Sequence, residues 1–309
     1  MTLVSIITPS LNQAAFLKQT MDSVFQQDHP ELEYIVVDGG SSDGSAEIIR
    51  QYADRLAWWT SEPDAGQAEA INKGLQHAHG EIVAWLNSDD YYLPRAVSSA
   101  VRAFTAEPEA VLVYGDMVAV DEEGRTVNLL RSGQLSLDDL LSFQIIGQPA
   151  AFMRSKALLE TGGLDTDFHF LLDHHLWIRL ARVGPIRHVD QMWAAARYHA
   201  AAKNRARAAD FGIEAFRILD WAERDAELAP VLRLVGGRAR ASAHRLNARY
   251  LLDGGRARES LRAWCRALVL HPPTALARLN LLASGILEIC GLGGIRRRIL
   301  RHRQRRLSG

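Results

Sequence analysis

The stretch that decides the fold is YIVVDGGSSDG at residues 34–44, where a strand-forming apolar run ends in Asp38 and a glycine- and serine-rich turn. A short apolar run bounded by turn residues is typical of a strand buried in a sheet. Similar runs occur at residues 4–8, 56–60, 81–86 and 110–114, and stretches of helical period lie between them. This alternation predicts an α/β fold, a mostly parallel sheet with helices on both faces.

Composition places the chain among globular proteins. Its 309 residues are 48% apolar and 23% charged, which is enough to build a core and excludes a disordered chain. Two widely spaced cysteines, Cys265 and Cys290, exclude a disulfide framework. The chain opens directly into a strand-like run without a basic leader, so we expect a cytoplasmic protein.

Charge divides the chain into two parts. Residues 1–204 hold 15 basic and 27 acidic residues (15 − 27 = −12), and residues 205–309 hold 21 and 9 (21 − 9 = +12). We therefore expect two domains, 1–204 and 205–309, with different partners. The arginine-rich end of the basic part makes an anionic lipid surface or a nucleic acid its candidate partner.

Acidic residues follow three of the expected strands, which is where ligands bind in open α/β sheets. Asp38 could accept hydrogen bonds from a ribose or a base, or it could belong to a turn and helix cap. Asp64 could do the same, or form a capping box with Gln67. The adjacent Asp89 and Asp90 suit a hard cation such as Mg²⁺, and a solvated turn is their alternative.

In order and spacing these segments resemble family 2 glycosyltransferases, inverting enzymes of the GT-A fold that use nucleotide-diphosphate sugars. The resemblance covers most of residues 1–204. The motifs that carry it are TPSLN (8–12), VDGGSSDGS (37–45), DAGQAEAINKG (64–74), NSDD (87–90), GGLD (162–165) and DHHLW (173–177).

The resemblance implies a role for each of these segments. Asp38 and Asp64 would hold the base and ribose of the donor, and Asp89 and Asp90 would bind Mg²⁺ or Mn²⁺ under the diphosphate, together with His199. The further donor contacts that it implies are Pro9, Ser10, Asn12, Gln67, Asn72, Ser88, Gln148 and Lys203. Asn87 and Gly39 stand where relatives often carry acidic residues, so the metal would depend on Asp89 and Asp90.

Asp173 matches the carboxylate that such enzymes use as catalytic base. Read alone, Asp173 is more simply the cap of a helix that begins near His174. The chemistry implied is transfer of a sugar, with inversion, from a nucleotide-diphosphate donor, by analogy a UDP-sugar, to a hydroxyl of a glycan or lipid-linked acceptor in the synthesis of a cell-envelope polysaccharide. The alternative is a non-catalytic nucleotide-sugar-binding scaffold that recruits partners or membrane through its helical half.

Beyond residue 205 the pattern turns helical. Residues 244–282 resemble one tetratricopeptide-type helix pair, and a plain helical extension is the alternative. The apolar stretch 279–295 is too short to span a bilayer, and the arginines after it suit peripheral binding at the inner face of the plasma membrane. A buried terminal helix is the alternative there. No nucleic-acid motif accompanies the arginines, so we expect no nucleic-acid partner.

Overall fold

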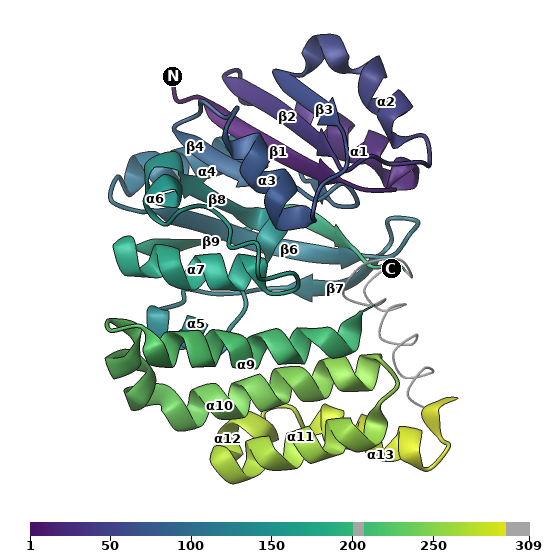
Figure 1. Ribbon diagram of the computed structural model, residues 1–309, viewed down its shortest axis with the longest axis vertical. Coiled ribbons are helices and arrows are strands. Elements are labelled where there is room, and N and C mark those ends of the chain that lie inside the picture. Colours follow the sequence, from purple (N-terminus) through teal and green to yellow (C-terminus); the bar gives the residue numbers. More distant parts are fainter. Residues whose placement is uncertain (200–206, 295–309) are drawn as a thin grey trace. The chain divides into compact units, whose positions relative to one another are not determined.

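The computed structural model of the protein describes residues 1–199 and 207–294 (Figure 1). Its chain contacts divide it into two compact units, each described by itself below. The first comprises Met1–Gly124, Asn128–Leu135 and Ile146–Arg197, and the second comprises Arg125–Val127, Ser136–Ile145 and the chain from Tyr198 onward. Two short segments of the acidic half therefore belong to the helical unit.

One nine-stranded sheet organises the first unit. It starts with four parallel strands in the order β3 (Trp58–Ser61), β2 (Leu32–Asp38), β1 (Val4–Ser10) and β4 (Ile82–Trp85). Beyond β4 the sheet is mixed, because β8 (Ala151–Arg154) runs antiparallel to both of its neighbours. The order continues with β6 (Leu112–Val120), β9 (Ile186–Arg197) and β5 (Tyr91–Tyr92), and β7 (Thr126–Leu130) pairs with β6. The predicted α/β sheet is confirmed: strands β1–β4 are all parallel, and β6 and β9 form a further parallel pair.

Alternate side chains of a strand point to opposite faces of the sheet, and helices cover both faces. Val4 and Ile6 belong to a buried cluster with side chains of α1 (Ala14–Phe25) and α4 (Ala96–Ala106). Ile7 points the other way, to α3 (Gln67–Leu75), where a Cβ on Gly74 would lie 2.6 Å from Ile7 Cγ2. Figure 1 shows α3 and α7 (Leu172–Val183) over the near face of the sheet. The first unit is completed by α2 (Ser45–Gln51), α6 (Ser155–Glu160) and the short 3₁₀ turns η1 (Ala53–Arg55) and η2 (Gln148–Ala150).

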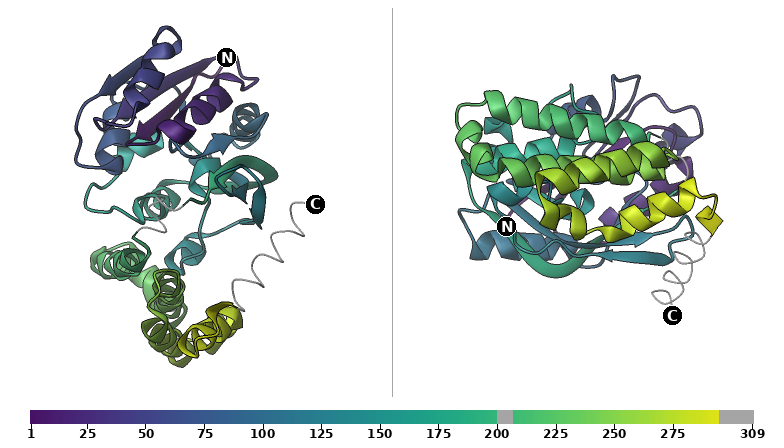
Figure 2. Two further views of the ribbon diagram at one scale, coloured as in Figure 1. Left: turned by 90° about the vertical axis from the view of Figure 1, so that its right-hand side faces the viewer. Right: turned by 90° about the horizontal axis from the view of Figure 1, so that it is seen from below.

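Helices make up the second unit, as the sequence predicts. They are α5 (Leu137–Leu141), α9 (Ala208–Arg224), α10 (Leu228–Asp253), α11 (Ala257–Leu270), α12 (Pro272–Leu276) and α13 (Leu279–Ile289), and the long ones lie side by side (Figure 2). Phe211 stacks on Tyr250 with ring centroids 4.3 Å apart, which pairs the start of α9 with the end of α10.

Small residues let α10 and α11 approach closely. Ala241, Ala248, Ala263 and Ala267 form a buried cluster with Trp264, whose Nε1 donates to the Ala275 carbonyl at 3.2 Å. The two helices therefore form a hairpin across residues 254–256. Among the described helices, none combines the length and the apolar content needed to cross a membrane.

Candidate active site

The pairing of β1, β2 and β3 brings the polar residues at the ends of these strands together. Ser10 of β1 lies opposite Asp38 of β2, and Asp38 lies opposite Ser61 of β3. These are the last residues of three neighbouring parallel strands, so their side chains meet at the carboxyl edge of the sheet. Ser10 Oγ is buried there and has no hydrogen-bond partner within the described part of the chain.

Asp38 is fully buried and organises the loop after β2. One oxygen accepts from Ser41 Oγ (2.5 Å), and the other accepts from the Ser41 backbone N–H (2.9 Å) and Ser61 Oγ (2.7 Å). Asn12, at φ 52°, ties the loop after β1 to this loop, because its N–H donates to Ser41 Oγ and its Oδ1 accepts from the Ser42 N–H. The two loops form one rigid rim.

Asp64 reaches the same rim from the segment before α3. A Cβ on Gly39 would lie 2.8 Å from Asp64 Oδ2, so the carboxylate occupies the space that a side chain at Gly39 would need. This explains the departure from an acidic residue at position 39. The pKa of Asp64 is raised by burial. Its Oδ1 accepts from the N–H of Gly66, which caps α3, so the capping-box alternative with Gln67 is wrong.

Gln67 instead begins a chain of amide hydrogen bonds. Its Nε2 donates to Asn87 Oδ1 at 2.7 Å, and Asn87 Nδ2 donates to Gln148 Oε1 at 3.1 Å. Gln148 Nε2 then donates to the Trp85 carbonyl at 2.7 Å. A backbone carbonyl can only accept, so this last bond fixes the orientation of every amide before it. We call Gln67, Asn87 and Gln148 the amide relay.

The relay explains why residue 87 is not acidic. Asn87 accepts on one side and donates on the other, and its Nδ2 also lies 3.4 Å from Asp90 Oδ2. A carboxylate could accept from Gln67 but would face two further acceptors, Gln148 Oε1 and Asp90. Gln67 and Gln148, both predicted donor contacts, are joined through Asn87.

The two aspartates that follow in the sequence, Asp89 and Asp90, differ in how deeply they are buried. Asp90 is 6% exposed, and its Oδ1 accepts from the Arg197 N–H at 2.9 Å while Oδ2 faces Asn87. Burial raises the pKa of Asp90 well above its usual range, and the neighbouring charge of Asp89 raises it further. Asp89 is only half-buried. Both oxygens of Asp90 are thus committed to the protein.

Arg197, which sequence reasoning did not assign, holds this turn in place. Its buried guanidinium donates from Nε to the Asp89 carbonyl (3.0 Å), from Nη1 to the Glu122 carbonyl (2.8 Å) and from Nη2 to Gln19 Oε1 (2.5 Å). It also lies over the ring of Phe16, 4.7 Å from the centroid. In sequence Arg197 is only the residue that ends an apolar run, so nothing there predicted these contacts.

The other donor contacts expected in this unit divide into two groups. Pro9 and Ser88 are buried at the ends of β1 and β4, and the Ser88 carbonyl accepts from Thr20 Oγ1 at 2.9 Å. Asn72 is used differently: its Nδ2 donates to the Leu164 carbonyl (2.8 Å) and its Oδ1 accepts from the Leu164 N–H (2.9 Å). Both ends of the Asn72 amide are hydrogen-bonded to the backbone of Leu164, which attaches α3 to the loop after α6.

Asp173 lies in the first turn of α7 and is half-buried. The helix begins at Leu172 and its capping residue is Leu171, so the alternative that Asp173 caps a helix from His174 is wrong. Six residues further along α7, Arg179 donates to the carbonyls of Thr161 (2.8 Å) and Gly163 (2.7 Å). These bonds attach α7 to the loop that precedes it.

Two predicted residues lie elsewhere in the chain. His199 is buried and belongs to the second unit, and Lys203 lies outside the described residues. Among the residues that the structure describes, no three histidine, cysteine or acidic side chains gather in a way that could hold a metal. Asp89 offers the carboxylate oxygens that Mg²⁺ and Mn²⁺ prefer, and a diphosphate and water would have to complete the coordination shell.

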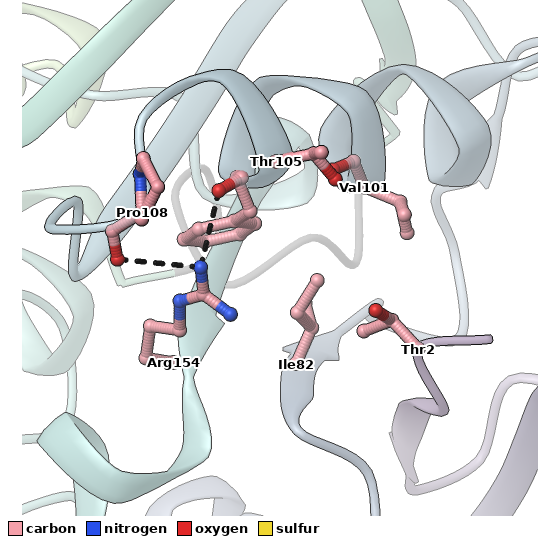
Figure 3. Close-up of a pocket in the computed structure, with 7 residues that line it drawn as sticks. Thr2, Ile82, Val101, Thr105, Pro108 and Arg154 are labelled. Carbon is pink, nitrogen blue, oxygen red and sulfur yellow. Dashed lines mark hydrogen bonds between the residues drawn. The ribbon is translucent and has the colours of Figure 1, made fainter.

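A hollow of about 200 Å³ lies at the opposite edge of the sheet (Figure 3). It is lined by Thr2, by Ile82 at the start of β4 and by Arg154 at the end of β8. Arg154 donates to the carbonyls of Phe104 (3.1 Å) and Pro108 (3.4 Å). None of the residues predicted from the sequence lines it.

The solved structures of similar fold include those of a mannosyltransferase and of TarS. A mannosyltransferase of Pyrobaculum calidifontis, in complex with GDP-Man and Mn²⁺, has a TM-score of 0.62 at 21% identity, covering 93% of this chain and 84% of that one. S. aureus TarS in complex with UDP-GlcNAc has a TM-score of 0.58 at 18% identity, covering 96% and 92%. At these identities the likeness concerns the fold, which is the GT-A fold.

Sequence relatives cover about half to two thirds of the chain. An uncharacterised glycosyltransferase of Rickettsia conorii is 29% identical over 209 residues, 64% of this chain and 34% of the relative, so the chain spans about a third of that protein. TuaG of Bacillus subtilis, a glycosyltransferase named for teichuronic acid biosynthesis, is 33% identical over 150 residues, 47% of this chain and 59% of TuaG. The sequence model of glycosyl transferase family 2 matches residues 5–161, 157 of the 309 residues, and the chain belongs to that family.

Proposed function

We propose that the protein is an inverting, metal-dependent glycosyltransferase that moves a sugar from a nucleoside-diphosphate donor to a hydroxyl group of a glycan or a lipid-linked acceptor. The observation that carries this proposal is the continuous polar edge from Asp38 through Asp64 and the amide relay to Asp89. It follows the carboxyl ends of β2, β1 and β4, the place at which open α/β sheets bind nucleotides.

The nucleoside end of the donor is assigned to Asp38 and Asp64. Both carboxylates are acceptors, and a base N–H and two ribose hydroxyls are donors. Ser10 adds a buried hydroxyl without a partner in the described part of the chain, and the rim built by Asn12 fixes its surroundings. Pro9 lines the same loop.

The diphosphate end is assigned to Asp89. Of the two adjacent aspartates, Asp90 is buried and its carboxylate oxygens face protein donors, whereas Asp89 is only half-buried, so we assign direct ligation of Mg²⁺ or Mn²⁺ to Asp89. A bound divalent cation supplies neutralisation of the charge that develops on the leaving diphosphate. Arg197 and Asp90 then act as positioning residues, which fix the backbone of the Asp89 turn.

Asp173 is assigned as the base. The acceptor oxygen forms a bond to the anomeric carbon as the carbon–oxygen bond to the diphosphate breaks, and the bonding electrons leave with the diphosphate. The acceptor proton passes to the Asp173 carboxylate. A single displacement without a protein nucleophile inverts the anomeric configuration.

The relatives direct the search for substrates. UDP-GlcNAc and GDP-Man are donors found with proteins of the same fold, and TuaG points to a cell-envelope polysaccharide as the class of acceptor. His199 and Lys203 are proposed to contact the diphosphate or its metal on the strength of the family resemblance.

The test is release of nucleoside diphosphate from a panel of UDP-, GDP- and dTDP-sugars, with Mn²⁺, Mg²⁺ or EDTA, by the purified full chain. We expect slow, metal-dependent release from sugars of one nucleotide, accelerated by a suitable acceptor glycan and abolished by Asp173→Asn. A folded protein that binds a nucleotide sugar but releases nothing with any acceptor would support the scaffold alternative instead.

A further inference from the structure

One face of α13 is apolar and exposed to solvent. Leu279 is 52% exposed and Ile286 is 47% exposed, and Ile289, the last residue of the helix, is 42% exposed. Leu279, Ala283, Ile286 and Cys290 follow the spacing i, i+4, i+7, i+11, which places them in one line along a helix. We call this line, with Ile289, the apolar stripe.

The stripe is not needed to pack the helix. Gly285 of α13 faces α11, where a Cβ on it would lie 2.9 Å from Leu261 Cδ2, and Leu281 and Leu282 pack against the cluster around Trp264. The helix is therefore attached through another face and leaves the stripe to water. The expectation of a buried terminal helix is wrong, because Gly285 is its one buried residue.

Positive charge surrounds this stretch of the chain. Residues 254–309 contain twelve arginines and only two acidic residues, Glu259 and Glu288. Seven of the arginines follow the stripe within residues 296–306. Four more are exposed on or beside α11 and α13 and make no ion pair with an acidic residue in the part of the chain described: Arg258, Arg262, Arg266 and Arg278.

We propose that the apolar stripe and the four exposed arginines, Arg258, Arg262, Arg266 and Arg278, form a docking surface for an anionic lipid bilayer. Exposed Leu and Ile side chains on one side of a helix enter the boundary between headgroups and acyl chains, and arginines beside them attract lipid phosphates. An apolar helix face alone or a group of arginines alone binds a bilayer weakly, and the two together give stable attachment. The helix lies in the plane of the surface without crossing it.

The combination of an apolar stripe with arginines favours a lipid bilayer over a nucleic acid and over a second copy of the chain. A nucleic acid would use the arginines but has no place for a row of aliphatic side chains. A second copy of the chain would cover the apolar stripe but would bring its own four exposed arginines to the same interface, where like charges repel. An anionic bilayer offers acyl chains to the apolar stripe and phosphate groups to the arginines. This inference does not depend on the glycosyltransferase activity.

The test is flotation of the full chain with phosphatidylcholine vesicles, with and without about 30% phosphatidylglycerol, in about 0.1 M and 0.5 M salt. We expect binding to the anionic vesicles only, reduced at high salt. Ile286→Asp should lower the partition coefficient about tenfold, because it places a charge in the part that enters the bilayer. The matched control is Ile213→Asp on α9, where Ile213 is 62% exposed, and it should bind as the native protein does.

A second variant tests the charge. Replacing Arg258, Arg262 and Arg266 together by Gln should weaken binding to anionic vesicles at least tenfold, while circular dichroism shows an unchanged helix content. Equal binding to neutral and anionic vesicles, or equal loss in Ile286→Asp and Ile213→Asp, would overturn the proposal. So would a dimer in sedimentation that Ile286→Asp converts to a monomer, because the apolar stripe would then bind a second copy.

Discussion

Trp177 of α7 stacks on Trp85 of β4, with ring centroids 5.4 Å apart and planes inclined by 21°. Both side chains are buried. Trp177 lies four residues after Asp173, one turn along the helix, and Trp85 lies four residues before Asp89. The pair therefore joins the helix that carries the proposed base to the strand that leads into the proposed metal site.

We expect substitutions of this pair to act on geometry. Trp177→Ala should cost about 3–5 kcal/mol in the free energy of unfolding, because it opens a cavity between helix and sheet. Trp177→Phe should fold but lower kcat about tenfold with little change in the donor KM, since α7 shifts relative to β4 while the nucleoside rim is untouched. Trp58→Phe, at a half-buried ring that stacks on His77, is the control. Equal kinetic effects in both Phe variants would contradict the positioning role.

Asn87→Asp tests the amide relay. The new carboxylate would face Gln148 Oε1 and Asp90, so we expect a loss of about 1–3 kcal/mol in stability at neutral pH. Its pKa in the folded state would be raised above the unfolded value, so this loss is present above the folded pKa and shrinks as the pH falls through it. Denaturant unfolding across pH measures this. The control Asn280→Asp, at an exposed position of α13, should change the free energy of unfolding by no more than a few tenths of a kcal/mol. An equally small change in Asn87→Asp would contradict the role given to the amide relay.

Arg197→Lys tests the attachment of the acidic turn. A lysine has one charged nitrogen and cannot reach the carbonyls of Asp89 and Glu122 and the Gln19 amide together. We expect the metal-dependent part of nucleotide affinity to fall about tenfold and the affinity measured in EDTA to stay unchanged. Arg102→Lys, an exposed position on α4, serves as the control. A loss of affinity in EDTA as well would show a general effect on folding.

The raised pKa of Asp64 predicts a pH dependence of donor binding. Burial favours the protonated carboxyl, which cannot accept from the ribose as a carboxylate does, so the donor KM should rise on acidification at a pH above the ordinary 3.8 of an aspartate. Asp64→Asn should show a KM about tenfold higher at neutral pH and no such rise. An Asn variant with the native KM at neutral pH would mean that Asp64 does not contact the donor.

The strands and the acidic residues at their ends could be predicted because the sequence patterns that mark them are local. An apolar run that ends in Asp38 marks both a strand and its carboxyl edge, and strand pairing then brings such edges together. It could not separate Asp89 from Asp90, since burial of Asp90 depends on the backbone of Arg197, 107 residues away. The roles of Asn72, Arg197 and the Trp85–Trp177 pair depend in the same way on contacts between distant segments. The exposure of the apolar stripe on α13 likewise depends on which of its faces packs on α11.

The central claim, a nucleotide site whose metal is held by Asp89, is tested most directly by calorimetric titration of UDP, GDP and dTDP in Mn²⁺ and in EDTA. The native protein should bind one of them with Mn²⁺ and lose most of that affinity in EDTA. Asp89→Asn should behave in Mn²⁺ as the native protein does in EDTA, and Asp90→Asn, which replaces a buried carboxylate held by protein donors, should keep most of its metal response. Metal-dependent binding that survives in Asp89→Asn and is lost in Asp90→Asn would contradict the account.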